Sequence, residues 1–173
     1  MINIENTVKS ETVYKGNIIS VRLDTVALPD GGTAARDVVE HGGGVCVLPF
    51  DSEGNVYLVR QYRKGADEVL LEAPAGKLSA GEGHFTCGAR ELLEETGFYA
   101  REYVYLGFIY PTPAYVTEKI HIYHAYGLSR GEAKLDFDEF LDVCKLPYKQ
   151  ARAMARSGEI TDAKTVVSLL RGE

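Results

Sequence analysis

The sequence predicts an α+β fold, with a mixed central sheet, flanking helices and a small antiparallel β-sheet unit at the N-terminus. Two observations support this prediction. Short runs of β-branched and aromatic residues alternate with turn signals over much of the chain, and segments with helical spacing of apolar residues are interleaved with them. The length of 173 residues, 45% of them hydrophobic, suits one domain, or one domain with a small appendage.

The N-terminal unit is predicted from residues 11–41, which read as an antiparallel meander. Its β-prone runs lie at residues 12–14, 18–26 and 36–40. A turn signal, Pro-Asp-Gly-Gly, occupies residues 29–32. Three consecutive glycines at residues 42–44 give the backbone unusual conformational freedom, as expected at a boundary between two units. We therefore expect an N-terminal β-sheet unit at residues 1–41 and a main domain at residues 42–173.

The main domain is predicted to mix strands and helices. Strands are expected at residues 45–50, 55–63, 69–74, 102–110 and 119–127, with a turn at residues 51–54. Two helices are expected at residues 148–156 and 162–170. Thr161 is the expected N-cap of the second of these, with Asp162 in its first turn.

Composition excludes several classes of function. The 25 acidic residues outnumber the 19 Lys and Arg and give a formal charge of −6, which argues against non-specific binding to nucleic acid. The three cysteines, Cys46, Cys87 and Cys144, are widely spaced and suit neither a disulfide framework nor a zinc knuckle. Without a long apolar run or a basic, apolar leader, we expect a cytoplasmic protein that does not bind membranes.

Residues 83–96 form the clearest predicted helix. Its apolar side is made of Phe85, Ala89, Leu92 and Leu93. Gly97 is placed to end it in the left-handed conformation. At about 100° per residue, three glutamates share an arc of about 100° on the side away from the core. They are Glu91, Glu94 and Glu95.

This acidic face is costly as plain helix surface. Like charges three or four residues apart cost about 0.2–0.5 kcal/mol each, and anions in a last turn oppose the helix dipole by about 0.3–1 kcal/mol. Arg90 is expected to neutralise one carboxylate, but not all three. A hard divalent cation such as Mg²⁺ or Mn²⁺ would turn the repulsion into coordination. A solvated acidic helix end is the alternative, and local spacing does not decide between them.

A longer pattern surrounds this helix. Gly76 is followed after five residues by Glu82, and after seven more by the run Arg-Glu-Leu-Leu-Glu-Glu-Thr-Gly-Phe at residues 90–98. The pattern resembles, at every defined position, the signature of the Nudix hydrolases. That signature is a loop–helix–loop that binds divalent metal and cleaves nucleoside diphosphates linked to another moiety. The resemblance implies a Nudix α/β/α sandwich.

The resemblance also implies roles for residues of the motif. The metal-binding positions would be Glu91, Glu94, Glu95 and the carbonyl of Ala75. Arg90 and Glu82 match positions that orient those carboxylates. Gly76 and Gly97 match the turns at the two ends of the helix, where a Cβ would be costly.

The flanking sequence resembles the ADP-ribose pyrophosphatase branch of the family. Pro113 stands 15 residues beyond the signature, where that branch has a marker proline, although Thr-Pro-Ala replaces the common Ser-Pro-Gly. Further similar segments are residues 35–41, 60–63 and 71–76. In that branch Arg36 and Arg63 would contact the diphosphate and adenosine. The N-terminal sheet would exchange across a two-fold homodimer.

Two more acidic positions are implied by the same resemblance. Glu118 matches a position near the terminal ribose. Residues 135–142 match a loop that carries a catalytic or additional metal-binding glutamate, for which Glu139 is the first choice and Asp138 the second.

The implied reaction is metal-dependent hydrolysis of ADP-ribose to AMP and ribose 5-phosphate. Within the family, another nucleoside diphosphate sugar such as GDP-mannose or ADP-glucose is the nearest alternative. A non-catalytic nucleotide sensor is a further alternative, but such domains usually lose signature glutamates, and this chain keeps them. Removal of mutagenic nucleotides is disfavoured, because members with that role tend to be shorter and lack the N-terminal sheet.

Overall fold

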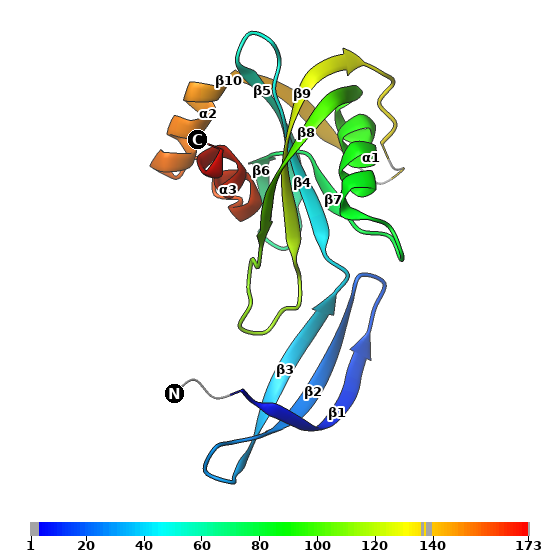
Figure 1. Cartoon of the computed structure of the whole chain (residues 1–173), viewed down its shortest axis with the longest axis vertical. Coiled ribbons are helices and arrows are strands. Elements are labelled where there is room, and N and C mark those ends of the chain that lie inside the picture. Colours follow the sequence, from blue (N-terminus) through cyan, green and yellow to red (C-terminus); the bar gives the residue numbers. More distant parts are fainter. Residues whose placement is uncertain (1–3, 136, 138–139, 173) are drawn as a thin grey trace. The chain divides into compact units, whose positions relative to one another are not determined.

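The computed structural model describes residues 4–135, 137 and 140–172. The chain forms two compact units (Figure 1). The first contains the residues up to Gly43 together with Tyr110–Lys119, and the second contains Gly44–Ile109 and the chain from Ile120 onward.

The first unit is an antiparallel sheet of three strands in the order β1-β2-β3 (Figure 1). The strands are β1 (Asn6–Lys15), β2 (Ile19–Ala27) and β3 (Thr33–His41). The predicted meander is confirmed, although its first strand begins at Asn6, ahead of the expected run at residues 12–14. The loop Tyr110–Lys119 joins β3 through two backbone hydrogen bonds, from the Val39 N–H to Tyr115 (2.7 Å) and from the Thr117 N–H to Val39 (2.9 Å).

The second unit contains two sheets. The four-stranded sheet has the order β7 (Ala75–Lys77), β4 (Gly44–Pro49), β9 (Ile120–Arg130), β8 (Phe98–Ile109). Its β4–β9 pair is parallel and its other pairs are antiparallel, so the sheet is mixed. The other sheet is antiparallel, with the order β10 (Leu141–Pro147), β5 (Asn55–Arg63), β6 (Glu68–Glu72).

Three helices cover the mixed sheet: α1 (His84–Thr96) on one face, and α2 (Tyr148–Ser157) and α3 (Ala163–Arg171) on the other (Figure 1). The alternation of β4 explains this layering, because successive side chains of a strand point to opposite faces. Val45 and Val47 pack in one core with residues of α1, whereas Cys46 and Leu48 pack in another with residues of α2 and α3. The predicted α/β/α sandwich is confirmed.

Several details differ from the sequence-based expectations. The strand β10 occupies residues where no strand was predicted, and β8 begins at Phe98, directly after the left-handed Gly97, instead of near residue 102. The N-cap of α3 is Asp162 rather than Thr161, because the Asp162 carboxylate accepts a hydrogen bond from the Thr165 N–H. In the described part of the chain, no helix combines the length and apolar character needed to cross a bilayer.

Candidate active site

The three glutamates of α1 do not share a solvent-facing surface. Glu91 is 8% exposed and Glu95 is 3% exposed, whereas the side chain of Glu94 is 35% exposed. The expectation that all three face away from the core is therefore wrong for two of them. Phe85, placed on the apolar side, is instead 53% exposed and meets Tyr103 edge-on.

The cause is the strand β7, which comes close to the helix. A Cβ built at Gly76 would overlap the carboxylate of Glu91, so only glycine permits this approach. On the sheet side, a Cβ at Gly88 would lie 3.1 Å from the side chains of both Val45 and Val47, which shows how tightly α1 packs on β4. Close packing on two sides buries carboxylates that helical periodicity alone places in solvent.

Arg90 neutralises more of this charge than expected. Its guanidinium donates from Nη1 to Glu91 and Glu94 (2.8 Å each) and from Nε and Nη2 to Glu82 (3.0 Å each). Arg90 was expected to neutralise one of the three helix glutamates and not all three, and it bonds two of them. Glu95 instead accepts a hydrogen bond from the Ala75 N–H at 3.1 Å.

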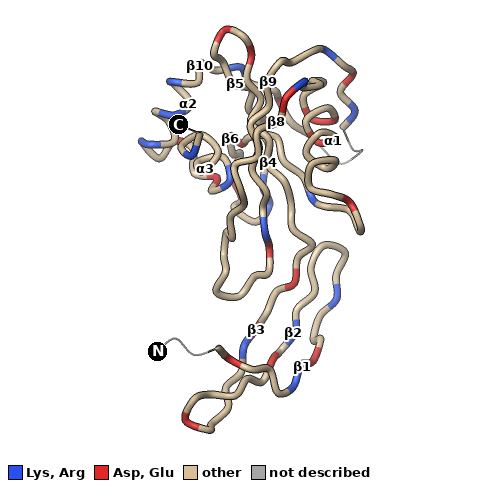
Figure 2. Tube along the Cα trace, in the orientation of Figure 1, with Lys and Arg blue, Asp and Glu red and all other residues tan. Residues whose placement is uncertain are grey.

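Acidic positions gather on α1, whereas α2 carries basic positions (Figure 2).

Glu82 lies just before α1 in the chain, and hydrogen bonds to its carboxylate lower its pKa. Hydrogen bonds from Arg90 and from the Ser79 N–H lower the pKa of Glu82 to about 2. A carboxyl whose pKa is lowered by folding stabilises the folded state above its unfolded pKa, and this contribution is lost as the pH falls through the folded value.

We therefore expect Glu82→Gln to lower the free energy of unfolding well above pH 4.5, and to lower it much less near pH 2. Urea unfolding of wild type and variant at both pH values measures this. Glu68→Gln, on an exposed residue, is the control and is expected to change stability little at either pH. An equal loss for Glu82→Gln at both pH values would contradict the assigned pairing.

The donor set fits a hard divalent cation. Carboxylate and carbonyl oxygens are the preferred ligands of Mg²⁺ and Mn²⁺, and two of the carboxylates are buried, where a negative charge needs a compensating partner. In the described part of the chain, no three His, Cys, Asp or Glu side chains converge closely enough to hold a metal ion. Because Arg90 already donates to Glu91 and Glu94, a cation would compete with it for these two carboxylates.

Arg63 lies on β5 and is held by a residue that sequence reasoning did not single out. Its Nε and Nη2 donate to the two carboxylate oxygens of Glu72 at 2.7 Å each, while 42% of its side chain remains exposed. Lys164 donates to the same carboxylate at 2.5 Å. Burial raises the pKa of Glu72, but Arg63 and Lys164 outweigh it and the pKa is lowered. No local signal links Glu72 to Lys164, which is 92 residues away.

A hollow of about 550 Å³ lies beside β5, and its lining includes Arg60, Gln61 and Tyr62 from the predicted substrate-side run. The Gln61 Nε2 atom is buried without a hydrogen-bond partner among the described residues.

The remaining predicted substrate contacts lie in the first unit. Arg36, on β3, is paired with Glu5 (Nε to Oε2, 3.0 Å), which raises the pKa of Arg36. Glu118 lies 3.4 Å from His41 Nδ1, and Pro113 lies in the loop Tyr110–Lys119. Glu139 and Asp138, chosen as catalytic candidates, lie outside the described residues.

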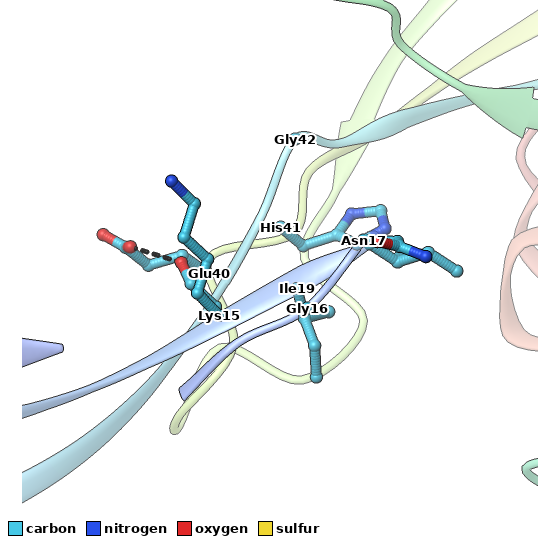
Figure 3. A pocket seen from close by; sticks show the side chains of 9 residues that line it. Lys15, Gly16, Asn17, Ile19, Glu40, His41 and Gly42 are labelled. Atoms are coloured by element: carbon cyan, nitrogen blue, oxygen red, sulfur yellow. Dashed lines mark hydrogen bonds between the residues drawn. The ribbon is translucent and has the colours of Figure 1, made fainter. Parts of the chain in front are cut away.

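The first unit also has an open hollow of about 380 Å³ at the β1–β2 turn (Figure 3). It is lined by both ends of that turn, by Glu40 and His41 at the end of β3, and by Gly42, which follows them. Neither Arg36 nor Glu118 lines it. Sequence reasoning assigned no ligand to this hollow.

Known proteins resemble the chain over nearly its whole length. It is 38% identical to the methanol dehydrogenase activator of Bacillus methanolicus and 36% identical to the ADP-ribose pyrophosphatase of Bacillus subtilis strain 168, each over 95% of this chain and 90% of the relative. It is 37% identical to the GDP-mannose pyrophosphatase of Salmonella arizonae, over 78% of this chain and 75% of that protein.

A solved structure described as an ADP compounds hydrolase shares the fold, with a TM-score of 0.85 and 22% identity over 98% of this chain and 92% of that one. Residues 5–39 match the nucleoside diphosphate sugar hydrolase N-terminal domain, and residues 40–167 match the NUDIX domain. The second match covers most of the chain and contains the complete signature between Gly76 and Phe98. The protein therefore belongs to the Nudix family.

Proposed function

We propose that the protein hydrolyses the diphosphate bond of a nucleoside diphosphate sugar, with ADP-ribose as the substrate and AMP and ribose 5-phosphate as the products. The observation that carries this proposal is the pair of buried glutamates, Glu91 and Glu95, held under the β7 segment by Gly76 and Ala75. Relatives that are named for pyrophosphatase activity, and that align with nearly the whole chain, support it.

The proposal includes a divalent cation, Mg²⁺ or Mn²⁺. The residues that would hold it are Glu91, Glu94, Glu95 and the carbonyl of Ala75. When bound, the cation supplies positive charge to the diphosphate and makes a water molecule more acidic. Arg90 holds Glu91 and Glu94 together before binding.

Other side chains of this chain bind the substrate and move the proton. The exposed part of the Arg63 guanidinium donates hydrogen bonds to phosphate oxygens, while Glu72 fixes its orientation. The attacking water must lose a proton, and we assign its acceptance to Glu139, with Asp138 as the second choice. Arg36, Pro113 and Glu118 are our proposed contacts to adenosine and the terminal ribose.

We also propose a cytoplasmic homodimer that forms through the N-terminal unit at residues 1–41. The strand β1 supports this, because it is an edge strand exposed along its whole length. Its exposed residues include Val8, Val13 and Tyr14. Three free cysteines, two of them buried, suit a reducing compartment.

The test of the proposed function is a substrate panel. Purified protein with Mg²⁺ is offered ADP-ribose, ADP-glucose and GDP-mannose, and the products are separated by chromatography. We expect the highest kcat/KM for ADP-ribose. Preference for GDP-mannose would instead favour the activity named for the Salmonella relatives, and binding without turnover of any substrate would indicate a sensor.

Arg63 offers a separate test of substrate binding. Lysine keeps the charge against Glu72 but loses the bidentate geometry. We therefore expect Arg63→Lys to raise the KM for ADP-ribose about tenfold, with a smaller change in kcat. Steady-state kinetics measure both parameters. Arg101→Lys, on an exposed residue, is the control, and an unchanged KM for Arg63→Lys would exclude Arg63 from the binding site.

A further inference from the structure

The first turn of α3 is bonded to the backbone that leads into the Nudix signature. Thr165 Oγ1 accepts a hydrogen bond from the Ala73 N–H at 2.7 Å and donates to Asp162 Oδ2 at 2.5 Å. Both Thr165 and Ala73 are fully buried. Since buried N–H groups need partners, this hydroxyl fixes where Ala73 lies relative to the helix.

The preceding residue of that turn, Lys164, is bonded to the side chain of Glu72, the residue before Ala73. Lys164 Nζ donates to Glu72 Oε2 at 2.5 Å and to Asp162 Oδ1 at 2.9 Å. The side chains of Lys164 and Glu72 are 11% and 1% exposed. Glu72 therefore shares its single negative charge between a buried ammonium and the partly exposed guanidinium of Arg63.

The short segment between β6 and β7 is held at successive residues by three different elements. The Ala73 N–H is bonded to α3, the Pro74 carbonyl accepts from the Val47 N–H of β4 at 2.8 Å, and the Ala75 N–H donates to Glu95 of α1. A shift at Ala73 would be transmitted to Ala75, two residues further along. The carbonyl of Ala75 is one of the oxygens placed in the reaction centre under the proposed function.

We propose that Lys164 and Thr165 are positioning residues for hydrolysis, Lys164 acting through Glu72 on Arg63 and Thr165 acting through Ala73 on Ala75. This proposal rests on the proposed function, because only hydrolysis of the substrate requires Arg63 and the Ala75 carbonyl to be held in place. Neither residue belongs to the Nudix signature, which ends at Phe98, and α3 begins only at Ala163.

The two residues should have different kinetic effects. Without Lys164, the Arg63 guanidinium becomes the nearest cation to Glu72, so less of its charge is available to phosphate oxygens and substrate binding weakens. Without the Thr165 hydroxyl, a buried N–H loses its partner and the Ala75 carbonyl moves, which affects the chemical step. If the two residues had a purely structural role, their substitutions would lower stability, but one would not change mainly KM while the other changed mainly kcat.

The experiment compares four full-length variants with wild type. We expect Lys164→Met to raise the KM for ADP-ribose about tenfold with little change in kcat, and Thr165→Val to lower kcat about tenfold with little change in KM. Thr165→Ser retains the hydroxyl and is expected to restore kcat. Ser168→Ala is the matched control, because Ser168 is buried on the same helix and its Oγ has no partner among the described residues.

A second measurement does not depend on turnover. The exchange rate of the Ala73 amide hydrogen, measured by NMR, is expected to be at least about tenfold higher in Thr165→Val than in wild type. Thr165→Ser and Ser168→Ala are expected to keep the wild-type rate. Should Thr165→Val fail to fold, Thr165→Cys, a weaker acceptor of similar size, takes its place.

The outcomes separate the two proposals. A wild-type protein that hydrolyses no member of the substrate panel defeats the proposed function. Unchanged Ala73 exchange in Thr165→Val defeats the positioning role by itself. The positioning role is also overturned by a second result with an active wild type. In that result, Lys164→Met and Thr165→Val change kcat and KM alike, in proportion to their loss of thermal stability.

Discussion

Replacement of Glu95 by glutamine is expected to lower kcat/KM for ADP-ribose about a thousandfold, since a charged group at the reaction centre stabilises the transition state by several kcal/mol. Glutamine has nearly the same shape, and its side-chain oxygen still accepts the Ala75 N–H that Glu95 accepts at 3.1 Å. The fold should therefore survive, while the negative charge is lost. Steady-state kinetics at saturating Mg²⁺ measure the effect.

Two controls make this result specific to the charge at Glu95. Circular dichroism and thermal unfolding should match wild type, because the buried hydrogen bond is retained. Glu68→Gln removes a carboxylate from an exposed site on β6 and should leave kcat/KM unchanged. Wild-type turnover by Glu95→Gln would remove the buried glutamates from the mechanism.

The second large effect is expected at Gly76. A methyl group there would overlap the Glu91 carboxylate, so either β7 or the helix must move. We expect Gly76→Ala to destabilise the fold by about 1–3 kcal/mol, as overpacking does, and to lower kcat/KM about a hundredfold through the displaced carboxylate. Urea unfolding and steady-state kinetics measure the two effects.

Gly65→Ala is the matched control for this substitution. A Cβ at Gly65 meets no atom within 4 Å. Because alanine also restricts the unfolded chain, the control is expected to leave activity intact and stability equal or slightly higher. Normal stability and turnover in Gly76→Ala would show that the approach of β7 to Glu91 is not needed for function.

The sequence predicts well those features that local patterns determine. The bounds of α1, its end at the left-handed Gly97 and the N-terminal meander all follow from periodicity and turn residues within a few positions. The signature from Gly76 to Phe98 is equally local, so the family could be identified from it. The strand β4 likewise follows from a short apolar run, which predicts a strand at residues 45–50.

Features that depend on distant contacts could not be predicted in this way. The burial of Glu91 results from the approach of β7, which helical periodicity does not include. The strand β10 mixes apolar and charged residues and is only partly buried, so its pairing with β5 leaves no clear apolar alternation. The bond between Glu72 and Lys164 joins residues far apart in sequence, and without an alignment nothing local links them.

We propose that the α1 carboxylates support hydrolysis of ADP-ribose. The most direct test of this proposal is chromatographic identification of products from ADP-ribose and purified wild-type protein, with and without Mg²⁺ or Mn²⁺. We expect AMP and ribose 5-phosphate in equal amounts, formed only when the divalent cation is present. Intact ADP-ribose under both conditions, or equal turnover after the cation is removed by chelation, would contradict it.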